Sequence, residues 1–165
     1  MIDFNALAAW MAGSPIAAWV KSSEWIWPGL EIFHFIGLTL VVGVAGVFDA
    51  RLLGVAKQIP IGALNTLIPW AVVGIIINAI TGVLFIFAEP TRYFGNPAFI
   101  WKMAFLTIAG LNVVVFGALF AKKTLPVGAG GDAPPAAKVI AVVSLVSWFA
   151  VMYFGRMLPY LGEAF

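Results

Sequence analysis

The sequence predicts an all-α protein, namely a transmembrane four-helix bundle with short interfacial helices at its N-terminus. Its 165 residues are 63% hydrophobic and only 10% charged, whereas about a quarter of the residues in soluble domains are charged. Four apolar stretches are each long enough to cross a bilayer, which takes about 20 helical residues. Segments rich in proline, glycine and polar residues separate them. We therefore expect one integral membrane domain over residues 1–165.

Residues 4–22 mix alanine and tryptophan with polar side chains. Ser14-Pro15 is typical of a helix start, with serine as the N-cap and proline at the first helical position. We expect two short helices at the membrane surface, with their tryptophan rings at headgroup depth. An ordinary ordered N-terminal arm is the alternative.

The first predicted span covers residues 23–49 and begins with two tryptophans. Asp49 and Arg51 follow at its end, where we interpret them as a membrane-boundary anchor. Residues 51–69 are too polar to span a bilayer, and they predict a short helix on the membrane surface.

Three further spans are predicted over residues 69–88, 98–122 and 136–160. Asn78 and Asn112 lie near the middle of two of them. A buried amide needs a hydrogen-bond partner, so we expect both side chains to bond to a neighbouring helix.

The orientation follows from the basic residues that flank the spans. Four spans place both chain ends on one side of the membrane. The loops after the first and third spans carry more lysine and arginine than the opposite side does, and basic loops stay in the cytoplasm. We therefore expect a protein of the bacterial inner membrane with both termini periplasmic. The five basic residues of the two loops are Arg51, Lys57, Lys122, Lys123 and Lys138.

The first span holds Glu31 and His34, the only histidine in the chain. The two residues are three positions apart, so they share one face of a helix. Ionisable groups inside a membrane are costly and therefore mark functional sites. His34 is either a hydrogen-bonded structural residue, a haem ligand, a copper ligand or a proton carrier. Haem ranks above copper, because copper sites gather several histidine, methionine or cysteine ligands and the chain has no cysteine.

Other side chains are expected near His34 in the outer half of the bundle. Lys102 and Arg156 would hold haem propionates. Glu31 either fixes the imidazole tautomer or forms a salt bridge to one of these two cations. Met103 and Met152 are candidate second iron ligands. Trp148 either packs on a flat cofactor or fills the core.

The net charge of +2 is too small and too scattered to indicate nucleic-acid binding. We expect the protein to lie in a lipid bilayer and to bind either a second copy of the chain or a redox partner protein. The alternative is that the protein is a non-catalytic membrane subunit or scaffold. Its Glu, His, Lys and Arg side chains inside the spans would then only link helices.

The run from His34 to Gly37, together with Gly43, Gly46 and Arg51-Leu52, resembles the first helix of the HemJ-type membrane protoporphyrinogen oxidases. Residues 81–90 and 101–123 resemble their second and third helices. CopD-like copper-resistance membrane proteins are looser relatives in pattern. The resemblance implies an all-helical membrane protein that binds b-type haem, with His34 as the iron ligand and with Arg51 and Lys102 as functional residues.

The chain departs from that family in the third helix, where a further histidine is replaced by Leu111-Asn112. Its pattern of Glu31, His34 and Asp49-Ala-Arg51 is more similar to small uncharacterised bacterial four-helix membrane proteins. Haem-based electron transfer, porphyrinogen oxidation and a non-catalytic role are therefore the competing expectations.

Overall fold

The computed structural model describes residues 4–161 and confirms the predicted all-α fold, with four helices long and apolar enough to cross a membrane. The chain is thus a multi-pass membrane protein. The four candidate spans are Ile26–Leu52, Ile61–Ala88, Pro97–Thr124 and Pro135–Leu161.

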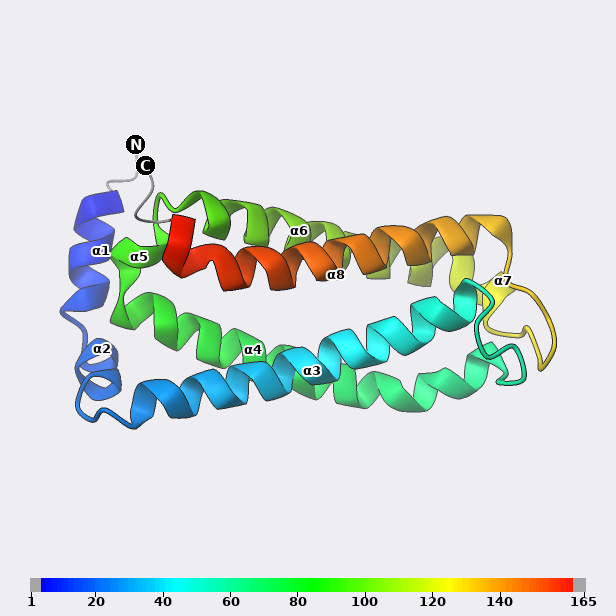
Figure 1. The fold of residues 1–165 in the computed structure, drawn as a ribbon, viewed down its shortest axis with the longest axis horizontal. Helices are drawn as coiled ribbons and strands as arrows, with labels where there is room; N and C mark the ends of the chain where they lie inside the picture. Colours follow the sequence, from blue (N-terminus) through cyan, green and yellow to red (C-terminus); the bar gives the residue numbers. More distant parts are fainter. Residues whose placement is uncertain (1–3, 162–165) are drawn as a thin grey trace.

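Two short helices precede the first span, α1 (Phe4–Ala12) and α2 (Pro15–Val20). The predicted start of α2 is confirmed, since the Ser14 side chain accepts a hydrogen bond from the backbone N–H of Ala17 at 3.2 Å and Pro15 is the first helical residue. Helix α1 crosses the end of the bundle at a steep angle to the long helices (Figure 1).

Helix α3 (Ile26–Leu52) begins three residues later than predicted. Its start is delayed because Ser23 to Trp25 form a turn, in which the Ser23 hydroxyl accepts a hydrogen bond from the Trp25 N–H at 3.3 Å.

The short helix predicted within residues 51–69 is present as a 3-10 turn, but it is continuous with the second span. A 3-10 turn, η1 (Ile61–Leu67), leads directly into α4 (Ile68–Ala88). The reason is that the apolar side chains of Ile61 and Leu64 are buried in the protein rather than laid on a membrane surface.

The third span is made of α6 (Pro97–Val115), a π-helical turn η2 (Phe116–Phe120) and α7 (Ala121–Thr124), and it follows the short helix α5 (Pro90–Tyr93). Helix α8 (Pro135–Leu161) is the fourth span. Asn96 caps α6, accepting a hydrogen bond from the Ala98 N–H at 2.9 Å and donating one to the Leu158 carbonyl of α8 at 3.0 Å.

The long helices form two pairs, α3 with α4 and α6 with α8, and α8 also contacts α3. Gly37 and Gly74 allow the first pair to cross closely. A Cβ atom on Gly74 would stand 2.6 Å from the Gly37 carbonyl oxygen, and one on Gly37 would stand 2.9 Å from the Gly74 carbonyl oxygen. Only glycine fits at this crossing.

Apolar clusters hold the bundle together at both ends. We call the end beside α1, α2 and α5 the N-helix end, where Phe85, Tyr93, Ala98 and Leu158 form the cluster. We call the opposite end, where α3 and α7 finish and α8 begins, the loop end. Its cluster contains Leu52, Ile61, Ala133, Ala137 and Ala141.

Candidate functional site

His34 lies on the α3 face that packs against α4, near the N-helix end. Its Nδ1 atom is 2.7 Å from the hydroxyl oxygen of Thr81. The Thr81 hydroxyl also donates to the Ile77 carbonyl of its own helix at 2.7 Å. Thr81 is buried and His34 is half-buried. The two side chains therefore link α3 to α4 at one point of the crossing.

This hydrogen-bond arrangement assigns the imidazole tautomer. A threonine hydroxyl has a single proton, and Thr81 gives it to the Ile77 carbonyl. Thr81 then accepts from Nδ1–H of His34, which leaves the lone pair on Nε2. Among residues 4–161, Nε2 has no hydrogen-bond partner. It is the ring atom that would ligate a metal or accept a proton.

Aromatic rings border His34 toward the N-helix end. The Phe85 ring meets the imidazole edge-on, with centroids 5.7 Å apart, and Trp27 packs on Phe85 at 4.8 Å. The Trp27 indole N–H donates to a Glu31 carboxylate oxygen at 3.0 Å. Glu31 thus bonds to Trp27 and not to the partners that we predicted, His34, Lys102 or Arg156.

Lys102 approaches the site from the other helix pair. It is half-buried on α6 and lies against Gly155 of α8, where an added Cβ would stand 3.8 Å from Nζ. Its ammonium is near enough to act electrostatically on the His34 imidazole. Within residues 4–161, Lys102 forms no ion pair.

Arg156 does not join them. Its side chain is exposed, donates to the Tyr160 hydroxyl at 3.3 Å and stacks over the Tyr160 ring at 5.4 Å.

The two methionines differ in placement. Met103 is 43% exposed on α6, on the outside of the bundle. Met152 is half-buried and lies with Trp148 and Gly155 along one stripe of α8, since their spacings are four and three residues. No group of three or more His, Cys, Asp or Glu side chains that could hold a metal occurs in the part of the chain that the structure describes.

Arg51 lies about 25 Å from His34 along α3, at the loop end. It is 2% exposed, so its side chain is enclosed by protein at the end of the span. Its guanidinium donates only to backbone carbonyls, from Nε to Ile59 at 2.5 Å and from Nη2 to Lys57 at 3.3 Å, Gly128 at 3.4 Å and Gly131 at 3.1 Å. Arg51 therefore fastens two loops together and takes no part in the His34 site.

The polar side chains inside the spans differ in whether they bond to the neighbouring helix. Asn112 donates to the Ile140 carbonyl of α8 at 3.1 Å, as predicted. Asn78 instead bonds within its own helix, to the Gly74 carbonyl at 3.0 Å. Thr81, the partner of His34, was visible only as a polar residue inside a span.

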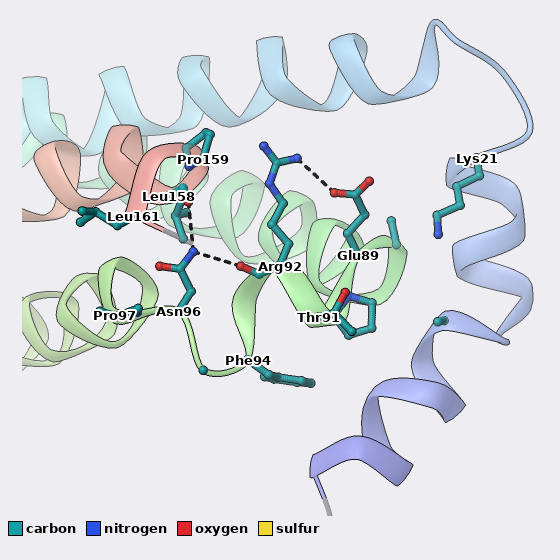
Figure 2. Close-up of a pocket in the computed structure, with 14 residues that line it drawn as sticks. Lys21, Glu89, Thr91, Arg92, Phe94, Asn96, Pro97, Leu158, Pro159 and Leu161 are labelled. Atoms are coloured by element: carbon teal, nitrogen blue, oxygen red, sulfur yellow. Dashed lines mark hydrogen bonds and ion pairs between the residues drawn. The ribbon is translucent and has the colours of Figure 1, made fainter. Parts of the chain in front are cut away.

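A cavity of about 860 Å³ opens at the N-helix end, between α2, α5 and the end of α8. Figure 2 shows its charged lining residues Lys21, Glu89 and Arg92, with Arg92 paired to Glu89 at 3.0 Å. His34 is not one of the lining residues. The cavity is separate from the site on α3.

Comparisons of the chain with models of known families, with curated proteins and with solved structures give no match. The resemblance to the HemJ-type oxidases stays a prediction.

Proposed function

We propose that this membrane protein binds a b-type haem through His34 and acts in electron transfer or small-molecule redox chemistry. The observation that carries the proposal is the hydrogen bond between His34 Nδ1 and Thr81 at 2.7 Å, because it presents Nε2 as a free lone pair. Haem-ligating imidazoles are held in this way, with the second ring nitrogen hydrogen-bonded.

The surrounding residues fit the same group. Lys102 supplies a cation without an ion-pair partner among residues 4–161, which suits a propionate. Phe85 and Trp27 supply flat apolar walls beside the imidazole. When bound, the haem supplies one-electron redox chemistry, and the protein sets its potential through the axial ligand and the apolar surroundings. Met152 is the better-placed candidate for a second ligand, because Met103 is exposed.

We also propose the membrane in which the protein lies and its orientation there. We place the protein in a bacterial inner membrane, with both termini periplasmic and the loop end cytoplasmic, because the loop end carries the greater basic charge. The electron partner would be a redox protein or a second copy of the chain.

The experiment is a pair of absorption spectra, oxidised and dithionite-reduced, of protein purified from cells supplied with haem precursor. A Soret band that is lost in His34→Ala and kept in Phe35→Ala supports the proposal, since Phe35 is 62% exposed on the same helix. A change of coordination in Met152→Leu but not in Met103→Leu would identify the second ligand. Rescue of cells that lack protoporphyrinogen oxidation would extend the function to that reaction.

A featureless spectrum from folded protein would overturn haem binding and favour a non-catalytic membrane subunit. One observation favours this second function. The His34–Thr81 hydrogen bond already satisfies one ring nitrogen and joins two helices, as a structural histidine would. His34→Ala would then lower the stability of the protein without changing its absorption spectrum.

A further inference from the structure

A second ionisable group is buried near the loop end, and the haem proposal does not use it. Asp49 lies on α3 three residues before the helix ends and is 5% exposed. Its Oδ2 atom is fully enclosed and has no hydrogen-bond partner among residues 4–161. The nearby hydroxyl belongs to Ser144 of α8, which is itself 6% exposed.

No lysine or arginine among residues 4–161 forms an ion pair with this carboxyl. Arg51 is two residues further along α3, which turns it about 200° around the helix axis. Its Nε and Nη2 atoms donate to loop carbonyls, and its Nη1 atom is buried with no hydrogen-bond partner in the described part of the chain. Asp49 and Arg51 are thus adjacent buried charges that do not pair.

The other charged groups at the loop end are directed elsewhere. Lys138 of α8 and Lys57 of the first loop both pair with Asp132, at 2.8 Å and 3.5 Å. Lys122 and Lys123 of α7 are exposed. Asp49 has no ion pair to any of these residues in the described part of the chain.

A carboxylate in such a position is expensive, because a buried charge needs a countercharge or several hydrogen bonds. A neutral carboxylic acid removes most of that cost, and its O–H gains the Ser144 hydroxyl as an acceptor. The geometry points to Asp49 as a proton-binding site, with Ser144 as its hydrogen-bond partner and the loop end as the side from which the proton enters and leaves.

The site lies where the two helix pairs meet. Asp49 belongs to the α3–α4 pair and Ser144 to the α6–α8 pair, and α3 packs on α8 at this end. Release of the proton places a charge at this contact, so it weakens the packing of one pair on the other. Proton binding at Asp49 is therefore coupled to how tightly the bundle closes at the loop end.

Infrared spectroscopy of the full chain in lipid vesicles tests this inference. The expected result is a protonated-carboxyl C=O band at mildly acidic pH that is absent from Asp49→Asn. The band should fall as the pH rises, while carboxylate bands grow, and should shift in D₂O. Asp132→Asn is the matched control and should keep the band, because Asp132 is exposed and the Lys138 hydrogen bond holds its pKa below the ordinary value.

A second pair of variants covers the case in which Asp49→Asn does not fold. Ser144→Ala should shift the frequency of the band, whereas Ser147→Ala should not, since the Ser147 hydroxyl donates to the Val143 carbonyl at 2.7 Å. Absence of the band at mildly acidic pH would overturn the assignment. So would a band that neither pH nor D₂O changes, or one that NaCl removes at constant pH while choline chloride does not, because the last result would indicate a metal-cation site.

Discussion

The Nδ1 atom of His34 lies 2.7 Å from the Thr81 hydroxyl, so the single histidine of the chain is held by the neighbouring helix. The Thr81 proton is directed to Ile77, which makes the imidazole the donor. The tautomer of the His34 imidazole therefore indicates whether α3 and α4 are in contact here, with or without a ligand at Nε2.

Thr81→Val should release the imidazole from the Nδ1–H tautomer. The valine keeps the shape of the side chain but removes the acceptor, and the loss of the bond should lower stability by about 1 kcal/mol. Nitrogen NMR of protein labelled at histidine measures the tautomer on one residue. Thr81→Ser retains the hydroxyl and should behave as the unchanged protein. An Nε2–H tautomer in the unchanged protein would contradict the assignment.

Gly74→Ala should destabilise the α3–α4 pair. The added Cβ would stand 2.6 Å from the Gly37 carbonyl oxygen and 2.8 Å from a Val41 methyl carbon, so the helices must separate. Overpacking of this kind costs roughly 1–3 kcal/mol. Unfolding in detergent measures the loss. Gly43→Ala is the control, because nothing lies within 4 Å of its added Cβ. Equal stability of the two variants would mean that the close crossing is absent.

Arg51→Lys should loosen the loop end although the charge is kept. Lysine cannot reproduce the planar fork that reaches carbonyls in two loops, and we expect a loss of roughly 3 kcal/mol. Hydrogen exchange at the Gly130 amide, which donates to the Lys57 carbonyl at 2.8 Å, reports the opening. Arg92→Lys at the exposed Glu89 pair should change little. Unchanged protection at Gly130 would show that Arg51 does not fasten the loops.

Tyr93 should ionise late and make the protein sensitive to alkali. Burial raises the pKa of Tyr93 to about 12, against an ordinary value of about 10. The folded state thus holds its proton more tightly than the unfolded state. The resulting stability is complete below about pH 10 and is lost toward about pH 12, at roughly 1.4 kcal/mol per pH unit.

Spectrophotometric titration of tyrosinate measures this ionisation directly. Tyr93→Phe should remove the last transition and reduce the alkaline loss of stability. Tyr160→Phe is the control and should keep both, because Tyr160 is 57% exposed. A last transition that persists in Tyr93→Phe would assign it to another tyrosine.

The four spans were predictable because bilayer thickness imposes a length and an apolar composition that the sequence displays directly. His34 was identifiable as a candidate site because an imidazole inside a span is conspicuous. Its partner was not, because the meeting of His34 with Thr81 depends on where two helices cross, and that is decided by Gly37 and Gly74.

The role of Arg51 could not be predicted from residue types. Its partners are backbone carbonyls of residues far apart in the sequence, such as Ile59 and Gly131, and carbonyls leave no mark on a sequence. The position of Asp49 beside Arg51 suggested a membrane-boundary anchor, whereas the turn of about 200° between them places each in a different environment.

The order of the helices along the chain has a consequence for biogenesis. Helices α3 and α4 are consecutive spans, and so are α6 and α8. Each pair is thus a hairpin whose contacts are nearby in sequence, and the first is fully synthesised before the second leaves the ribosome. The glycine crossing and the His34–Thr81 bond need only the first hairpin. Asp49 meets Ser144 only when the last helix arrives, so that contact forms late in membrane insertion.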